Sequence, residues 1–334
     1  MRGHRGRHDP RRRPGRSHPR RGGARRDRPR RAARTGPGPA GPSRLSPVAV
    51  VPRPPGAEPE LRAADFERAR ALAAAWAGLA LGPQKRAMVQ ARLGRRLRAL
   101  GLGSFAAYWA RLEDPTTAAE ERQAFINALT TNTTEFFREP HHFTYLRTRW
   151  APAAWARARQ GAPRRLRLWS AGCASGEEAY SLAIVLVEAG LVAPGWNTRV
   201  LASDIDTEAL ARAAAGRYPA ERLAALPPAV RVRHFRPRSD APREWEVQPA
   251  LRALVTVRRL NLVEEPWPIR THFDVIFCRN VLIYFDRPTQ RRILARLRAQ
   301  LVPGGLLALG HAESAFGLVE GLTPVGPTLY RAER

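Results

Sequence analysis

The stretch LRLWSAGCASGEEAYSLA, at residues 166–183, constrains the fold of this chain more than any other. Apolar residues lead into a turn of small residues at 170–176, and a helical pattern follows that opens on Glu177 and Glu178. A strand, a tight turn and a helix start together form the usual cradle for a nucleotide-like ligand. Small residues matter there because a ligand has to approach the backbone closely. The stretch therefore predicts a strand, a ligand-binding turn and a helix.

The residues of this turn limit the kind of ligand. They match neither the dinucleotide fingerprint G-x-G-x-x-G nor a phosphate-binding loop that ends in Lys and Ser or Thr. Two acids in the first helical turn disfavour a pyrophosphate, and they suit a ligand with a positive charge and hydroxyl groups. Glycine-rich turns without a ligand are also common, so a purely structural turn is the alternative.

A second strand with an acidic end favours the ligand interpretation. Residues 199–202 predict a short strand, and Asp204 and Asp206 follow it. An acid after the second strand of a βαβ unit can accept hydrogen bonds from ribose hydroxyls, and Asp204 is the first choice for that role. Asp206 is the second choice, or it caps a helix over Thr207–Ala215, since Asp is favoured at the N-cap.

Charge and composition separate the first 59 residues from the rest. The 334 residues carry a formal net charge of +28 and a pI of about 11.7, which suggests a nucleic-acid partner. Residues 1–59 are rich in Arg, Pro and Gly and poor in aromatic residues, so they predict a disordered tail. This tail is an arm for nucleic acid or an acidic surface, or it comes from a wrongly assigned start.

Targeting and metal-binding patterns are weak. No apolar core follows the basic start, as a secretory signal requires, and no stretch approaches the ~20 apolar residues of a membrane span. The two cysteines, Cys173 and Cys278, predict neither a metal cluster nor a disulfide, which favours a reducing, cytoplasmic setting. Among the histidines only the pair His141 and His142 could bind a metal, and we expect instead an ordinary helix-surface role.

Residues 60–130 predict a small all-helical domain. Helical periodicity covers 64–79, 84–100, 104–112 and 120–129, with a break at Gly82-Pro83. One face of the second segment is densely basic, which suits an acidic protein surface, although most basic helix faces are merely solvated. Its basic residues include Arg92, Arg95, Arg96 and Arg98.

A polar segment with two adjacent phenylalanines, residues 129–143, follows this domain. In one interpretation Thr133 or Thr134 caps a helix and the phenylalanines enter the core. In the other, the segment lies across the ligand pocket, where Asn132 and Thr134 hydrogen-bond to the ligand. Arg138 then presents a planar guanidinium to an anion. We assign 131–163 to an interdomain linker and helix.

Strands and helices alternate over residues 164–334, which predicts an α/β domain with a doubly wound sheet. A continuous apolar run at 273–277 is typical of a buried parallel strand, and it ends in Arg279 and Asn280. Polar groups at this end of a strand lie where open α/β sheets bind ligands. The other predicted elements are strands at 255–257, 306–309 and 328–330, a helix at 291–301 and a tight turn at 303–305.

Motifs that occur in order give residues 64–331 a family resemblance. They are FINALTTNTTEFFREPHHF, WSAGCASGEEAYSLAI, LASDIDTEAL, and FDVIFCRNVLIYFD with LVPGGLLALGHAES. The chain resembles the CheR-type chemoreceptor glutamate O-methyltransferases, which depend on S-adenosylmethionine. The resemblance implies an N-terminal all-helical domain, a class I methyltransferase domain with a Rossmann-like sheet, and a small β-subdomain inserted at about 218–256.

The resemblance also implies roles for individual residues. Arg138 and Tyr284 stand beside the transferring methyl group, and Asp204 is the ribose ligand. The implied cofactor site consists of Asn132, Thr134, Arg138, Glu178, Asp204, Asn261, Leu262, Arg279 and Asn280. The basic face with Arg92, Arg95, Arg96 and Arg98 would dock the glutamate-rich methylation helices in the cytoplasmic part of a receptor.

Some family members use the inserted subdomain to bind a receptor's C-terminal peptide as an added strand. Here the insert holds Pro237, Pro242 and Pro249, and proline cannot donate a hydrogen bond to a ladder. We therefore expect weak binding of such a peptide.

The implied activity is transfer of methyl groups from S-adenosylmethionine to receptor glutamates, which yields methyl esters and S-adenosylhomocysteine for sensory adaptation. We expect a cytoplasmic monomer that needs no metal, does not insert into membranes, and binds no nucleic acid stably through its folded part. The alternatives are a nucleic-acid methyltransferase or basic nucleic-acid-binding protein, and an adaptor without turnover. Against the first, residues 279–282 lack the Asn/Asp-Pro-Pro-Tyr/Phe motif of many amino-methylating enzymes.

Overall fold

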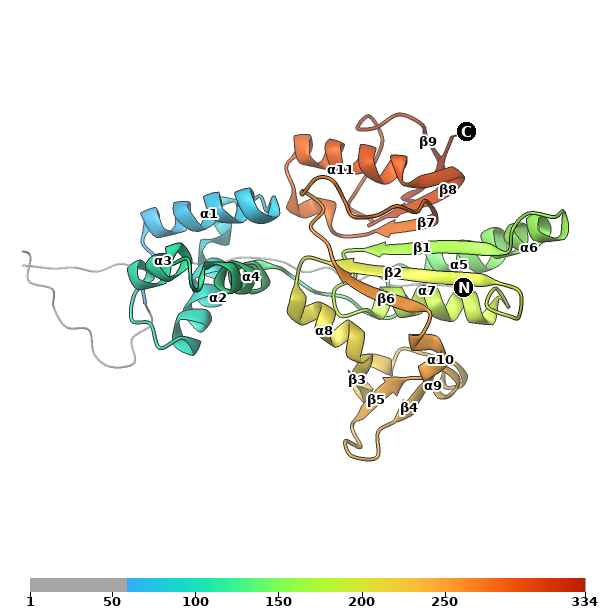
Figure 1. Cartoon of the computed structure of the whole chain (residues 1–334), viewed down its shortest axis with the longest axis horizontal. Coiled ribbons are helices and arrows are strands. Elements are labelled where there is room, and N and C mark those ends of the chain that lie inside the picture. The colour runs from blue at the N-terminus through green and yellow to red at the C-terminus, as the bar shows by residue number, and fades with distance from the viewer. Residues whose placement is uncertain (1–58, 334) are drawn as a thin grey trace, which may run out of the picture. The chain divides into compact units, whose positions relative to one another are not determined.

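The computed structural model describes residues 59–333, so the predicted disorder of residues 1–59 lies outside the described residues except at Pro59. The described part contains a helical domain, a seven-stranded sheet covered by helices, and a separate three-stranded sheet (Figure 1). This confirms the predicted α/β class with its N-terminal helical domain. Within residues 59–333 no helix is long and apolar enough to cross a membrane.

The helical domain follows the predicted periodicity closely. Its elements are α1 (Ala63–Ala77), η1 (Pro83–Lys85), α2 (Arg86–Ala99), α3 (Phe105–Glu113) and α4 (Ala118–Leu129). Gly78 ends α1 in the left-handed conformation, and the Ser104 hydroxyl caps α3 by accepting the N–H of Ala107 at 3.2 Å. Fully buried Leu93 and Phe125 belong to the core that holds these helices together. Local caps and an apolar stripe thus explain this domain.

The linker contains no helix or strand between Leu129 and Pro140. After it come α5 (Pro140–Tyr145), the π-helical turn η2 (Leu146–Trp150) and α6 (Ala151–Arg159). Neither Thr133 nor Thr134 caps a helix, so the interpretation of this segment as a capped helix start is wrong. Its expectation that Phe136 enters the core is confirmed, because Phe136 is buried. The expected surface position of His142 is also wrong. Its side chain is 0% exposed, and its Nε2 lies 3.1 Å from the hydroxyl of Thr328.

The large sheet has the strand order of a doubly wound fold whose direction reverses at one edge. In order, its strands are β6 (Val255–Arg259), β2 (Asn197–Asp204), β1 (Arg165–Ala171), β7 (Phe273–Cys278), β8 (Leu301–Leu309), β10 (Leu329–Ala332) and β9 (Leu322–Gly326). The first five are parallel, and β10 is antiparallel to both its neighbours. The chain winds outward from β1 to β6 and then returns to β7. A topological switch point therefore lies between β1 and β7, where such sheets bind ligands.

Helices cover both faces of this sheet (Figure 1). Those after β1, β2 and β7 are α7 (Glu177–Glu188), α8 (Thr207–Ala215) and α11 (Arg287–Ala299), and η4 (Leu282–Tyr284) precedes α11. Along β1, Leu166 and Leu168 pack in the core that contains α7, whereas Trp169 and Ala171 pack in the core that contains α11. Successive strand residues point to opposite faces, so β1 is buried on both sides.

Three details of the C-terminal half differ from the prediction. The helix predicted over 291–301 is α11, which begins at Arg287 because Asp286 caps it and ends at Ala299. Residues 303–305, predicted as a tight turn, lie inside β8 at an irregularity where the register with β7 shifts. Gly304 has a φ of 77°, so a strand can continue through a backbone geometry that the sequence suggests is a turn. The edge strand β9 was not predicted.

The small sheet is the inserted β-subdomain. Its strands lie in the order β3 (Arg217–Pro219), β5 (Glu244–Val247) and β4 (Phe235–Pro237), and both pairings are antiparallel. The helices η3 (Ala220–Leu223), α9 (Pro228–His234) and α10 (Pro249–Arg252) complete the insert. Each outer strand ends in a proline, a residue that suits an edge because it offers no N–H to a further strand. The expectation of weak peptide addition stays a prediction.

Asp206 joins the two domains at the start of α8. One carboxylate oxygen accepts hydrogen bonds from the backbone N–H groups of Glu208 and Ala209, each at 2.9 Å, so Asp206 is the predicted N-cap. The other oxygen accepts the hydroxyl of Thr130 at 2.7 Å and the side-chain amide of Asn132 at 2.6 Å. Asp206 is 2% exposed, so these bonds are shielded from water.

We expect Asp206→Ala to lower the free energy of unfolding by about 2–4 kcal/mol, because a helix loses its cap and two half-buried donors lose their buried acceptor. Urea denaturation followed by circular dichroism measures the loss. Asp286→Ala is the control, since Asp286 caps α11 at an exposed position by accepting the N–H of Thr289. Equal losses in the two variants would contradict the interdomain role of Asp206.

Candidate functional site

A cavity of about 340 Å³ opens where the carboxyl ends of β1, β2 and β7 meet the linker and the helical domain. Parallel strands present the polar residues that follow them at a common edge of the sheet, which explains why distant motifs meet here. All of the predicted cofactor and catalytic residues line this cavity: Asn132, Thr134, Arg138, Glu178, Asp204, Asn261, Leu262, Arg279, Asn280 and Tyr284.

The turn after β1 forms one wall of the cavity. The backbone N–H groups of Gly172 and Cys173 both donate to the carbonyl of Ser203, at 2.8 and 2.9 Å, which ties the turn to the end of β2. Gly172 has a φ of 84°, and a Cβ at this position would collide with the side chain of Val281. A glycine is therefore required for the wall to have this shape.

Asp204 closes the end of β2. Its two carboxylate oxygens accept the backbone N–H groups of Ala174 and Asp206, each at 2.9 Å. Burial raises the pKa of Asp204, and these backbone hydrogen bonds oppose the rise by favouring the carboxylate. Each oxygen of a carboxylate can accept about two hydrogen bonds, so Asp204 can also accept ligand hydroxyls. The second choice for a ribose ligand, Asp206, is used instead in the cap and the interdomain bonds.

Glu178 and Arg279 form an ion pair on the floor of the cavity. The guanidinium Nη1 lies 3.3 Å from Glu178 Oε2, and the hydroxyl of Ser170 donates to Glu178 Oε1 at 2.6 Å. Burial raises the pKa of Glu178, and the charge of Arg279 opposes that rise. The Arg279 side chain is 1% exposed and lies over the rings of Phe143 and Phe277, at 5.6 and 5.4 Å from guanidinium carbon to centroid.

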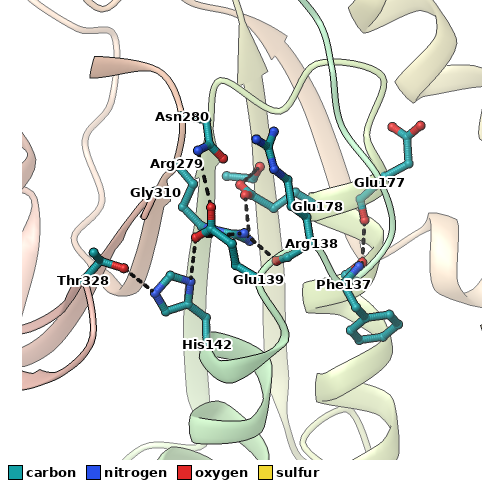
Figure 2. Close-up of polar contacts among 12 residues, drawn as sticks. Phe137, Arg138, Glu139, His142, Glu177, Glu178, Arg279, Asn280, Gly310 and Thr328 are labelled. Carbon is teal, nitrogen blue, oxygen red and sulfur yellow. Dashed lines mark hydrogen bonds and ion pairs between the residues drawn. The ribbon is translucent and has the colours of Figure 1, made fainter. Parts of the chain in front are cut away.

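The linker forms the wall opposite the sheet. Asn132 and Thr134 line the cavity, and Arg138 donates to the carbonyl of Thr133 at 2.9 Å. Figure 2 shows the side chain of Arg138 beside Glu178. The structure thus supports the interpretation in which this segment lies across the pocket.

The helical domain contributes lining residues that the sequence did not indicate. They are Ala77, Leu79, Ala80, Leu81, Lys85 and Met88, on both sides of the predicted break at Gly82-Pro83. Two hydrogen bonds hold this region to the sheet domain. Asn261 donates its side-chain amide to the carbonyl of Trp76 at 2.8 Å, and the N–H of Ala80 donates to the carbonyl of Tyr284 at 2.8 Å.

Glu313 is another residue that sequence reasoning missed, although it lies within the last family motif. It is 7% exposed and accepts the backbone N–H groups of Asn280 at 2.8 Å, Gly310 at 2.6 Å and Ile283 at 3.3 Å. These bonds fix the loop after β7 that carries Asn280 and Tyr284.

The predicted docking arginines of α2 differ in their surroundings. Arg92 donates to the carbonyls of Leu129 and Thr130 at 2.8 and 2.5 Å, so it holds the end of α4. Arg96 forms two hydrogen bonds to the 1%-exposed Glu121, at 2.9 and 2.7 Å. Arg95 and Arg98 are exposed. Because they are the more exposed of the four, Arg95 and Arg98 are the easiest for an acidic surface to reach, and the docking role of this face stays a prediction.

One group of described residues has the composition of a metal site. Glu139, His141 and His142 each offer a ligand atom, and these atoms lie within 4.8 Å of one another. However, Arg279 Nη2 lies 3.4 Å from Glu139 Oε2, so a cation already faces this carboxylate. The expectation that the protein needs no metal stays a prediction.

The buried polar groups fit S-adenosylmethionine. Asp204 can accept ribose hydroxyls, and Glu178 lies where it can face an ammonium group. Nε of Arg279 is buried without a hydrogen-bond partner, so this guanidinium retains a donor for a carboxylate. The set thus matches the hydroxyls and the charged ends of that cofactor.

Comparisons with known proteins identify the family of the chain. Residues 64–130 match the all-alpha domain of the CheR methyltransferases, and residues 132–329 match their SAM-binding domain. Chemotaxis protein methyltransferase 2 of Pseudomonas aeruginosa is 45% identical over 80% of this chain and 92% of its own length. The chemotaxis protein methyltransferase of Salmonella typhimurium is 46% identical over 80% of this chain and 89% of its own. The chemotaxis protein methyltransferase of Escherichia coli is 44% identical over 80% of this chain and 90% of its own length. These matches, which fit the cavity and the sheet order described above, show that the chain belongs to the CheR methyltransferase family.

Proposed function

We propose that this protein transfers methyl groups from S-adenosylmethionine to glutamate side-chain carboxylates of chemoreceptors. The observation that carries the proposal is that every predicted cofactor and catalytic residue lines a single cavity in a chain of this family. The matched relatives are named chemotaxis protein methyltransferases, and their names point to receptor methylation in sensory adaptation. The receptor substrate is the cytoplasmic methylation helix, and the enzyme acts as a monomer.

The lining residues divide the cofactor between them. Asp204 accepts the ribose hydroxyls, Glu178 faces the ammonium group, and Asn261 and Leu262 contact the adenosine part. Asn132 and Thr134 cover it from the linker. When bound, S-adenosylmethionine supplies a methyl group on a positively charged sulfur, and the carboxylates of Glu178 and Asp204 are the acidic groups of the cavity that face its charged and hydroxyl-bearing parts.

The nucleophile requires little activation by the protein. A free glutamate has a pKa of about 4.3, so the receptor carboxylate is already ionised near neutral pH and needs no general base. Arg138 can donate two parallel hydrogen bonds to such a carboxylate, and the hydroxyl of Tyr284 can donate another. Both side chains line the cavity, so they can aim the carboxylate oxygen at the methyl group. Orientation and exclusion of water supply most of the rate enhancement.

A tritium-transfer assay tests the proposal. The full chain is incubated with methyl-labelled S-adenosylmethionine and, in separate reactions, a chemoreceptor cytoplasmic fragment, RNA or DNA. We expect label only on the receptor fragment, and we expect alkali to release it as methanol, as carboxyl methyl esters do. A fragment whose methylatable glutamates are changed to alanine is the control. Alkali-stable label, or label on nucleic acid alone, would overturn the proposal.

The docking face allows a charge-matched test. We expect the double variant Arg95→Glu and Arg98→Glu to raise KM for the receptor fragment roughly tenfold at low salt, because it repels an acidic helix. Calorimetry should find the affinity for S-adenosylhomocysteine unchanged. The double variant Arg157→Glu and Arg159→Glu makes the same charge change at exposed positions of α6. Equal increases in KM for both pairs would assign the effect to net charge and remove the docking role.

A further inference from the structure

Glu139 lies at a junction between the linker and the loops that follow β7 and β8. Its Oε1 lies 3.3 Å from the side-chain amide of Asn280, and 3.3 and 3.1 Å from the backbone N and the ring Nδ1 of His311. Its Oε2 lies 3.4 Å from Arg279 Nη2 and 3.8 Å from His142 Nδ1. Figure 2 shows Glu139 between Asn280, Arg279 and His142. Glu139 thus contacts several parts of the site, although it is not among the predicted cofactor-binding or catalytic residues.

The backbone around Arg138 is held in an unfavourable geometry. Phe137 and Glu139, the residues on either side, have φ values of 55° and 54°, and Asn280 has a φ of 59°. Non-glycine residues in this region cost about 1–3 kcal/mol each, and they persist where surrounding contacts enforce them. The contacts here are the Ser181 hydroxyl, which accepts the N–H of Phe137 at 3.0 Å, and Arg279, which donates to the carbonyl of Arg138.

Arg279 is therefore the link between Glu139 and Arg138. Its Nη2 faces Glu139 and donates to the backbone of Arg138, while its Nη1 faces Glu178. A guanidinium is planar and rigid, so fixing one edge of it fixes the other. Without Glu139, one half of this buried group would have no carboxylate facing it.

The charges of the junction are consistent with this arrangement. Burial opposes ionisation of Glu139, but the hydrogen bonds from His311 and the charge of Arg279 outweigh it and lower the pKa of Glu139 to about 2. Burial, and then the charge of Arg279, lowers the pKa of His142 to about 4, so this histidine is neutral near pH 7. Arg279 is consequently the cation that two carboxylates, Glu139 and Glu178, share.

We propose that Glu139 is a positioning residue, which acts through Arg279 to hold the strained backbone that presents Arg138 to the methyl-transfer site. It does not contact the reacting atoms itself, and it does not appear among the residues that line the cavity. The inference rests on the proposed function, because Arg138 is assigned there as the residue that aims the receptor carboxylate.

The charge of Glu139 also influences Glu178. Burial is the main cause of the raised pKa of Glu178, Arg279 opposes it, and Glu139 adds to it by repulsion. Replacing Glu139 with glutamine removes the repulsion and leaves Arg279 to Glu178 alone, so the pKa of Glu178 falls. Cofactor binding that requires ionised Glu178 should then persist to lower pH. Glu178 is also faced by the charged or titratable groups of Arg138, Cys173 and Cys278, none of which the substitution changes.

The test compares Glu139→Gln with Glu188→Gln. Glu188 is a matched control, since it also faces a histidine and an arginine, with His234 Nε2 at 3.4 Å and Arg233 Nη1 at 4.0 Å, but it lies at the end of α7 outside the cavity. For Glu139→Gln we expect kcat on the receptor fragment to fall at least about tenfold, since a misplacement of about 1 Å can cost about 100-fold. The Kd for S-adenosylhomocysteine at pH 8 should change less than about threefold.

The pH dependence of S-adenosylhomocysteine binding is the second measurement. Isothermal titration calorimetry from pH 4.5 to 8 gives the affinity as a function of pH, and we call its loss at low pH the acidic limb. The acidic limb should move to lower pH in Glu139→Gln and stay in place in Glu139→Asp, which keeps the charge. A merely structural defect would not move that limb. An unchanged limb with unchanged kcat, equal effects in Glu188→Gln, or failure of the isosteric glutamine variant to fold would overturn the proposal. The pH dependence of S-adenosylhomocysteine binding is measured without receptor. If the wild-type protein did not methylate the receptor fragment, the proposed function would be refuted, but this binding measurement could still be interpreted.

Discussion

Arg138→Ala should lower kcat for receptor methylation by about 100-fold or more, while the Kd for S-adenosylhomocysteine changes much less. Removing one preorganised donor from an active site typically costs a factor of about 10²–10³ in kcat. The side chain of Arg138 lines the cavity. Among the described residues, its guanidinium donates one hydrogen bond, to the carbonyl of Thr133. Most of its five N–H donors can therefore face a substrate carboxylate. Single-turnover methylation measured beside calorimetric binding separates the two effects.

Two further variants sharpen this test. Arg138→Lys keeps the charge but loses the planar fork, so it should recover only part of the rate. Arg147→Ala is the control, because Arg147 is an exposed arginine of the neighbouring turn η2 and does not line the cavity. If Arg138→Ala weakened cofactor binding as strongly as turnover, Arg138 would be a cofactor-binding residue and would not orient the substrate.

Asp204→Asn should raise the Kd for S-adenosylhomocysteine by about 100-fold. The amide that replaces one oxygen would turn a donor toward a backbone N–H, either that of Ala174 or that of Asp206. The variant also loses charge-assisted hydrogen bonds to ribose hydroxyls, each worth about 1.5–3 kcal/mol. Isothermal titration calorimetry at pH 8 measures the change directly.

Asp274→Asn is the matched control for this substitution. Asp274 lies on β7, its pKa is also raised by burial, and it accepts the backbone N–H of Arg167 at 2.9 Å outside the cavity. We expect it to reduce stability without changing the Kd. A Kd that rises equally in both variants would show that Asp204 acts through the fold and does not bind the cofactor.

Local signals explain what could be predicted from the sequence. The helix Thr207–Ala215 has the predicted bounds because Asp206 caps its start and Gly216 ends it in the left-handed conformation. The apolar run at 273–277 predicted β7 correctly because a strand that is buried on both faces consists of a continuous run of apolar residues. The cavity residues could be predicted from two signals. Parallel strands place the motifs that follow them at one edge of the sheet, and the family resemblance implied the individual residues.

Contacts between distant segments explain what could not. Arg92 and Arg96 look alike on a basic helix face, yet their partners lie on or after α4, so no local pattern marks them as structural. The strand β9 contains Pro324 and shows no clear alternation, and only its pairing with β10 makes it a strand. His142 resembles a surface residue until the loop at Thr328 covers it.

The two thiols of the chain make it convenient for spectroscopy. Cys173 and Cys278 are its only cysteines, both are unbridged and buried, and burial raises the pKa of each well above that of a free thiol. Since the thiolate is the reactive species, neither should accept a maleimide dye while the protein is native. A single cysteine introduced on the exposed side of α2 would thus carry a fluorophore or crosslinker at one known place, with no need for a cysteine-free background.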